Sequence, residues 1–159
     1  MESAITLAYD TYGTVVDSNS KLVWKRYRST QASIDGIVPV TSGDSIVNAV
    51  AAVSNYLGAD FNAVSYMEQG HTAVETFDNI SGVHGIGLTG ITYEKALSYV
   101  GDGSPVIARI GEDEYIIITA YNSSEIAYIE ASTGAQKTVS MNDAGKMFSQ
   151  GGNIYVTYY

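Results

Sequence analysis

Three apolar runs in the second half of this 159-residue chain constrain its fold more than any other part of the sequence. They cover residues 106–110, 115–121 and 126–129, are rich in β-branched and aromatic residues, and are separated by short turn-forming segments. This pattern predicts three strands, and connections this short make neighbouring strands antiparallel. The middle run contains three consecutive isoleucines from Ile116, so we expect both faces of that strand to be buried.

The length suits one domain with its own hydrophobic core. We expect a single domain over residues 1–159. Residues 1–40 should supply N-terminal strands and an extended segment, residues 41–103 a helical part, and residues 104–159 the sheet with a closing helix. No apolar run approaches the roughly 20 residues that a membrane-spanning helix needs, so we expect no membrane span.

The composition excludes several kinds of site. The chain has no cysteine, which rules out a thiol nucleophile, a zinc–cysteine centre and a disulfide framework. The formal net charge of −9 disfavours binding to a nucleic-acid backbone, so we expect no nucleic-acid partner. Residues 22–28 combine aromatic and basic side chains and could bind a nucleic acid or a phosphate. A solvated strand explains them too, and the acidity of the rest of the chain favours that interpretation.

Between Asp44 and Leu57 the hydrophobic residues change period and recur mostly every three or four positions. This segment predicts a helix that Asp44 or Ser42 caps and Gly58 ends. Alanine and valine fill the segment and charges are nearly absent from it, so we expect the helix to be buried on most sides.

Weaker patterns predict the remaining elements. Helices are predicted at residues 61–69, 71–77, 92–100 and 140–150, and strands at residues 5–9, 22–28, 136–139 and 154–158. The glycine-rich stretch at residues 81–90 is predicted to be a connector. It lacks the Gly-Lys-Ser/Thr ending of a phosphate-binding loop and the Gly-x-Gly-x-x-Gly order of a dinucleotide-binding turn.

Two parts of the chain carry a family resemblance. The helical segment is Ser45-Ile-Val-Asn-Ala-Val-Ala-Ala-Val-Ser-Asn-Tyr-Leu-Gly58, and the strand segments are Pro105-Val-Ile-Ala, Glu114-Tyr-Ile-Ile-Ile-Thr-Ala-Tyr-Asn and Ala127-Tyr-Ile-Glu-Ala-Ser-Thr-Gly134. They resemble bacterial papain-like cysteine peptidases related to the bacteriocin-processing peptidases. In that family a cysteine opens the helix, and the strands read Pro-Val-Ile, His-Tyr-Val-Val-Val-Thr-Gly-Tyr-Asp and Asp-Pro near a Thr-Gly.

The resemblance covers roughly residues 40–159 and implies a fold class. That class is α+β, a papain-like cysteine peptidase fold in which a central buried N-terminal helix packs on an antiparallel β-sheet. The strand segments carry the more specific part of the resemblance, since the helix alone would be a weak signal.

The same resemblance implies that the catalytic positions are replaced. The cysteine position falls on Ser45, the histidine position on Glu114, and the residue that orients the histidine on Glu130. The glutamine that helps to bind the oxyanion, six residues before the cysteine, falls on Pro39. We therefore expect no catalytic residue in the family's sense, no cofactor and no metal.

An enzyme remains the alternative hypothesis. A serine needs a general base within hydrogen-bonding reach, and Glu114 with Glu130 could supply one if their mutual repulsion raised the pKa of one carboxyl. Such a rewired hydrolase would use Ser45 with these two carboxylates. The two histidines, His71 and His84, lie between helical segments and in the glycine-rich stretch, so surface or loop positions explain them better than a role as base.

A carboxylate cluster is a further alternative. Asp44, Glu114 and Glu130 could bind Ca²⁺ through their oxygens, although no acidic loop with calcium-ligand spacing is present. A helix cap explains Asp44 more simply.

The function favoured by these replacements is that of a catalytically inactive papain-like domain. We expect it to bind a peptide or protein in the groove between the helical part and the sheet, or to act as a scaffold. It would form part of a larger bacterial protein that is secreted or displayed on the cell surface.

Overall fold

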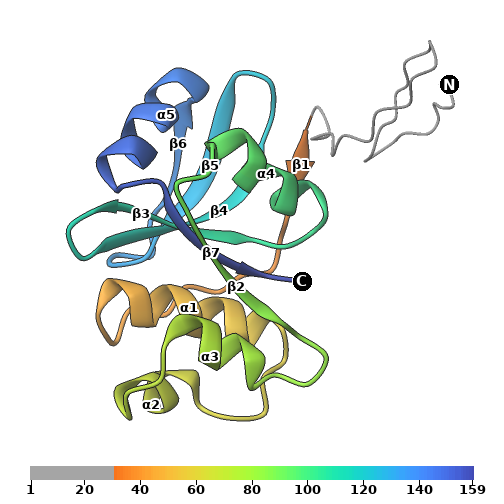
Figure 1. The fold of residues 1–159 in the computed structure, drawn as a ribbon, viewed down its shortest axis with the longest axis vertical. Coiled ribbons are helices and arrows are strands. Elements are labelled where there is room, and N and C mark those ends of the chain that lie inside the picture. Colours follow the sequence, from red (N-terminus) through yellow and green to blue (C-terminus); the bar gives the residue numbers. More distant parts are fainter. Residues whose placement is uncertain (1–30) are drawn as a thin grey trace, which may run out of the picture.

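The computed structural model describes residues 31–159, which form an α+β fold with one antiparallel sheet of seven strands (Figure 1). The strands are β1 (Ala32–Ser33), β2 (Gly85–Thr89), β3 (Val106–Gly111), β4 (Glu114–Tyr121), β5 (Glu125–Glu130), β6 (Gln136–Ser140) and β7 (Ile154–Tyr158). The helices are α1 (Ser45–Tyr56), α2 (Ala63–Glu68), α3 (Ala73–Asp78), α4 (Tyr93–Gly101) and α5 (Met141–Gln150). The strands predicted at residues 5–9 and 22–28 lie outside the described residues.

The strand order is β2-β7-β3-β4-β5-β6, and β1 pairs with β4 beside that path. The three predicted central strands are confirmed, and they are antiparallel as their short connections require. In the first connection Asp113 adopts a left-handed conformation with φ of 58°. In the second, Asn122 Oδ1 accepts hydrogen bonds from the backbone N–H groups of Ser124 and Glu125.

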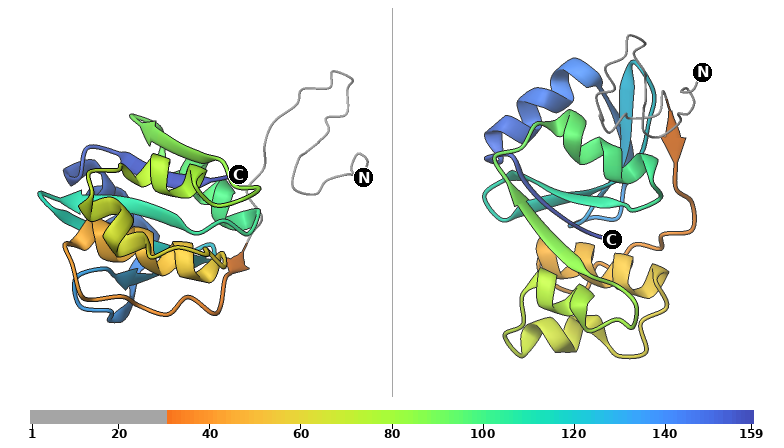
Figure 2. Two further views of the ribbon diagram at one scale, coloured as in Figure 1. Left: turned by 90° about the horizontal axis from the view of Figure 1, so that it is seen from below. Right: turned by 45° about the vertical axis from the view of Figure 1, so that its right-hand side comes forward.

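Both faces of β4 are buried, as the consecutive isoleucines predict. Ile116 and Ile118 belong to a hydrophobic cluster with residues of α4 and α5, such as Leu97 and Phe148. Ile117 belongs to a second cluster with residues of α1 and α3. Figure 2 shows these two groups of helices on opposite sides of the central strands. Each fully buried isoleucine contributes about 1.5–3 kcal/mol to stability.

Helix α1 is buried along most of its length, because its own side chains are mostly small and apolar. Val50 and Val53 are inaccessible to solvent. The buried Asn48 joins two neighbours to the helix, since its Nδ2 donates to Ala131 O at 3.0 Å and its Oδ1 accepts from Gly43 N at 2.8 Å. Gly58 follows the helix with φ of +80°, the left-handed conformation that glycine adopts readily.

The glycine-rich stretch contains an element that the sequence interpretation missed. Residues Gly85–Thr89 form β2, which pairs along its whole length with β7. A Cβ atom at Gly85 would lie 2.6 Å from the carbonyl oxygen of Val74, so the glycine allows α3 to approach the strand closely. The prediction of a connector at residues 81–90 was wrong for this part. Strand β1 was also missed, because it spans only two residues.

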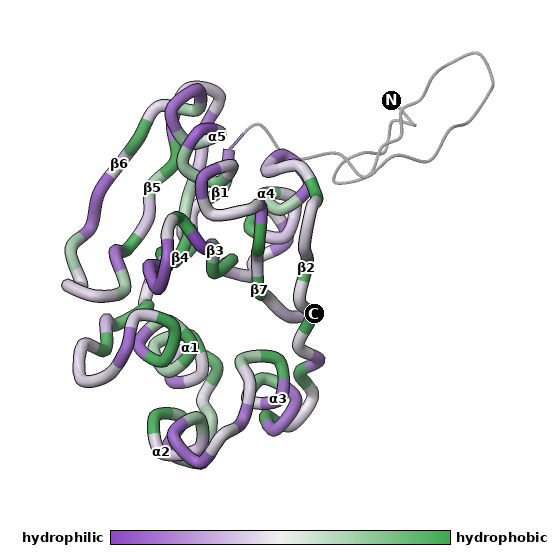
Figure 3. The backbone as a smooth tube through the Cα atoms, turned by 60° about the vertical axis from the view of Figure 1, so that its left-hand side comes forward, coloured by the Kyte–Doolittle hydropathy of each residue, from purple (hydrophilic) through white to green (hydrophobic). Residues whose placement is uncertain are grey.

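The other elements predicted within residues 31–159 are confirmed. Thr92 caps α4 by accepting a hydrogen bond from Lys95 N, and Ser140 caps α5 by accepting one from Asp143 N. The outer strand β6 is largely hydrophilic, as Figure 3 shows, and forms one edge of the sheet. Among residues 31–159 no helix combines the length and the apolar character that crossing a membrane requires.

Candidate functional site

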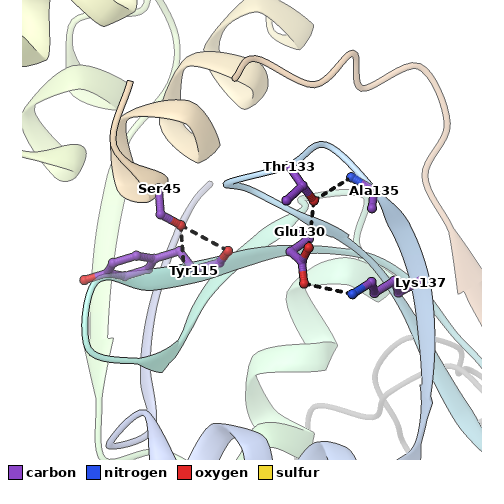
Figure 4. A network of polar contacts seen from close by, with 6 residues as sticks. All are labelled: Ser45, Tyr115, Glu130, Thr133, Ala135 and Lys137. Atoms are coloured by element: carbon purple, nitrogen blue, oxygen red, sulfur yellow. Dashed lines mark hydrogen bonds and ion pairs between the residues drawn. The ribbon is translucent and has the colours of Figure 1, made fainter. Parts of the chain in front are cut away.

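Ser45, to which the resemblance assigned the cysteine position, is the first residue of α1 and lies against β4. Its Oγ accepts a hydrogen bond from Tyr115 N at 2.8 Å and lies 3.4 Å from Tyr115 O, to which it can donate (Figure 4). Ser45 is 8% exposed. Both the donor and the acceptor capacity of this hydroxyl are therefore directed at the backbone of Tyr115. The contact joins the start of α1 to the central strand.

Glu130 has its own partners in the turn after β5 and on β6. Its Oε1 accepts from Thr133 Oγ1 at 2.7 Å, and its Oε2 forms an ion pair with Lys137 Nζ at 3.0 Å. The hydrogen bond from Thr133, followed by that from Lys137, lowers the pKa of the Glu130 carboxyl. In Figure 4 these bonds form a group separate from the Ser45 contact.

Strand pairing assigns Glu130 to a face of the sheet. Glu130 lies opposite Ile116, and directly opposed residues share a face. Ile116 points toward α4 and α5, whereas its neighbour Ile117 points toward α1. Glu130 is thus directed to the face away from the helix that carries Ser45, which does not suit a residue that orients a base for that serine.

Glu114, at the histidine position, is exposed and begins β4. It pairs with Gly111 across the hairpin, and its Oε1 lies 3.5 Å from where a Cβ of Gly111 would be. Its carboxylate is thus folded over the hairpin. Among the described residues, no hydrogen bond connects Ser45 with Glu114 or Glu130.

Pro39, at the oxyanion position, packs against the turn after β5. A Cβ at Gly134 would lie 3.0 Å from Pro39 Cβ. Proline has neither a backbone N–H nor a polar side chain, so Pro39 has no donor for an oxyanion.

The two histidines have stacking partners elsewhere. The ring of His71 stacks on Tyr66 with a centroid distance of 3.7 Å, and its Nδ1 lies 2.8 Å from Tyr66 O. The ring of His84 stacks on Tyr159 with a centroid distance of 5.4 Å. Neither histidine lines the pocket beside Ser45.

That pocket has a volume of about 260 Å³ and is lined by Asp44, Ser45, Ile46, Asp113 and Tyr115. Asp44 stands at the N-cap position of α1, but its side chain makes no capping hydrogen bond, which corrects the expectation that it would act as a cap. The sequence interpretation did not assign Asp113 or Tyr115 to the site. Asp113 belongs to a turn, and Tyr115 contributes backbone atoms that carry no side-chain signature.

In the part of the chain from residue 31 onward, no group of three or more His, Asp or Glu side chains is placed to hold a metal ion. The carboxylates of Asp44, Glu114 and Glu130 therefore do not form the calcium cluster weighed from the sequence.

Comparison with known proteins identifies the fold. No family model matches the sequence, and no curated protein sequence matches it. The structure is similar to the crystal structure of a protein assigned as a C39-like peptidase from Bacillus anthracis, with a TM-score of 0.66 and 12% sequence identity. The match covers 82% of this chain and 98% of that one. This chain therefore has the papain-like fold of a C39-like peptidase, as the family resemblance implied.

Proposed function

We propose that this chain is a catalytically inactive papain-like domain that recognises a peptide or protein beside Ser45. The observation that supports the proposal is the pair of contacts between Ser45 Oγ and the backbone of Tyr115. In this proposal Ser45 has a structural role at the position where a peptidase of this fold would carry its nucleophile.

The chemistry of serine supports an inert site. A serine hydroxyl becomes a nucleophile when a positioned base removes its proton. Ser45 Oγ can donate to the carbonyl oxygen of Tyr115, which lies 3.4 Å away, and a backbone carbonyl is not a general base. Glu130 is held by Thr133 and Lys137, and its lowered pKa makes its carboxylate a weaker base.

The pocket beside Ser45 suits the recognition of a basic side chain. Asp44 and Asp113 are two of its five lining residues, and both are acidic. Within residues 31–159 neither aspartate forms a salt bridge. We therefore propose a peptide with Lys or Arg as the preferred ligand, and a module of a larger bacterial secreted or surface protein as its context.

Peptide binding tests the recognition half of this proposal. Peptide libraries rich in Lys and Arg should bind better than libraries rich in Asp and Glu. Binding should weaken several-fold in the double variant Asp44→Asn, Asp113→Asn. The matched control removes two exposed acidic charges outside the pocket, Asp60→Asn with Glu68→Gln. Equal weakening in both double variants would show only a general charge effect and would contradict recognition at the pocket.

Covalent labelling tests the catalytic half. A fluorophosphonate reacts with serines that a base has activated, and intact mass followed by peptide mapping identifies the labelled residue. We expect no adduct on Ser45. An adduct on Ser45 that disappears in Glu114→Gln would instead support the rewired hydrolase.

A further inference from the structure

A second groove lies on the sheet, away from Ser45. Its volume is about 390 Å³, and its lining includes residues of β1, β4, β5 and β6. One row of paired residues crosses all four strands, because Ser33 pairs with Ala120, Ala120 with Ala127, and Ala127 with Thr138. The side chains along this row are small, so they fill little of the space above the sheet and the groove remains there.

The groove opens on the same face of the sheet as α1. Along β5, Ala127 and Ile129 point to the same side, and Ile129 packs in the cluster that contains α1. Ile126 and Tyr128, which flank Ala127 along the strand, point into the other core with α4 and α5. Helix α1 thus covers the isoleucine part of this face, and the alanine part is the floor of the groove.

The chain itself leads to the groove. Gln31, the first described residue, is part of the lining together with Ala32 and Ser33. An extended chain spans at most about 3.6 Å per residue, so residue 28 lies within roughly 11 Å of Gln31. The residues that precede Gln31 are therefore tethered beside the groove, and short tethers give effective concentrations on the order of millimolar.

The charges of the two parts of the chain are complementary. Residues 31–159 contain fourteen acidic and only four basic residues, and an exposed Glu125 lines the groove. Half of the chain's eight basic residues lie within residues 21–28: Lys21, Lys25, Arg26 and Arg28. The same segment contains Leu22, Val23, Trp24 and Tyr27, which supply apolar area for an alanine floor.

We propose that this groove is the docking site of the chain's own residues 21–28. The apolar side chains of the segment would cover Ala120 and Ala127, and its basic side chains would face the carboxylate of Glu125.

Disulfide trapping tests the location, because the chain has no cysteine of its own. Lys25→Cys is combined with Thr138→Cys, on the groove floor. The matched control combines Lys25→Cys with Lys146→Cys on α5, which packs against the opposite face of the sheet. In a glutathione buffer we expect the first pair to form an intrachain disulfide at least several-fold more than the control. Equal trapping, or trapping between two chains instead of within one, would overturn the proposal.

Fluorescence tests docking without a covalent bond, because Trp24 is the only tryptophan. Acrylamide should quench Trp24 several-fold less in the protein than in a free peptide of residues 21–28. Thr138→Arg, at an exposed position, should restore strong quenching by adding bulk and positive charge, and Ser149→Arg on α5 should not. High salt should act in the same direction as Thr138→Arg. Quenching equal to that of the free peptide would contradict docking, provided that circular dichroism shows a folded protein.

Discussion

Ser45 Oγ accepts a hydrogen bond from the backbone N–H of Tyr115 at 2.8 Å, across 70 positions of the sequence. The contact joins the first residue of α1 to β4, where β3 and β4 shift register between Arg109 and Gly111. The Ser45 hydroxyl thus connects the helical part of the structure to the sheet.

Removing this hydroxyl should destabilise the domain. Ser45→Ala leaves the half-buried Tyr115 N–H without its partner, so we expect a loss of about 1–2 kcal/mol in the free energy of unfolding. Urea denaturation measures this loss. Ser42→Ala, at an exposed position three residues earlier, should change stability by less than about 0.5 kcal/mol. Equal stability of Ser45→Ala and the wild type would argue against a structural role for the serine.

The buried Asn48 should be more sensitive still. Its side chain bonds to Gly43 N and Ala131 O, and Asn48→Ala would leave both groups without these bonds. We expect a loss of about 2–4 kcal/mol in the free energy of unfolding. Asn55→Ala, at an exposed position of the same helix, is the control and should cost little. A loss no larger than that of the control would mean that these two bonds contribute nothing to stability.

Glycine at position 85 should be required for the contact between α3 and β2. A Cβ there would meet Val74 O at 2.6 Å and Phe77 Cβ at 3.1 Å, so Gly85→Ala should lower the free energy of unfolding by about 1–3 kcal/mol. The matched control is Gly87→Ala on the same strand, whose Cβ would meet Val74 Cγ2 at an ordinary 3.6 Å. Thermal melting compares the two variants, and equal melting temperatures would contradict the steric explanation.

The Glu130–Lys137 pair should add a small dependence of stability on acid pH. The folded-state pKa of Glu130 is lowered from its ordinary 4.5, so its contribution is present above that pH and is lost as the pH falls through the folded value. Because the pair is partly exposed, the effect should be a fraction of a kcal/mol and should shrink with salt. Glu130→Gln should flatten the curve of unfolding free energy against pH below about 4.5. An unchanged curve would show that the pair does not contribute.

Two tyrosines should govern stability at alkaline pH. Burial raises the pKa of Tyr155 and of Tyr158 to about 12, from an ordinary value of 10. The unfolded chain then loses its phenolic protons first, so the stability contributed by the neutral rings is present below pH 10 and is lost as the pH rises toward 12. Tyr155→Phe should reduce this loss, and spectrophotometric titration of the folded protein should show that Tyr155 and Tyr158 ionise later than an ordinary tyrosine. Complete ionisation near pH 10 while the protein stays folded would contradict these values.

Sequence patterns predicted most of the elements but not how they meet. The consecutive isoleucines around Ile117 and the three-to-four spacing along α1 are local properties, so the central strands and the helix could be predicted. The pairing of β2 with β7 could not, because glycines at positions 85 and 87 remove the side-chain pattern of a strand, and the partner lies about 70 residues away.

The residues of the candidate site were likewise only partly predictable from the sequence. Ser45 could be assigned to the start of α1 from the sequence, but Glu130 could not be assigned to a face until its pairing with Ile116 was known. Tyr115 contributes its backbone N–H and C=O groups to the site. Every residue carries a C=O and nearly every residue an N–H, so the residue type could not predict this contribution. Asp113 lines the pocket because of the conformation of its turn, which the spacing of residues in the sequence does not reveal.

The central claim is that Ser45 holds the fold together and does not attack a substrate. The most direct test is incubation of the purified protein with a mixed peptide library, read by mass spectrometry, with Ser45→Ala and Glu114→Gln beside the wild type. We predict that no cleavage product depends on Ser45. Cleavage by the wild type that is lost in both variants would contradict the claim and would establish a serine hydrolase on this fold.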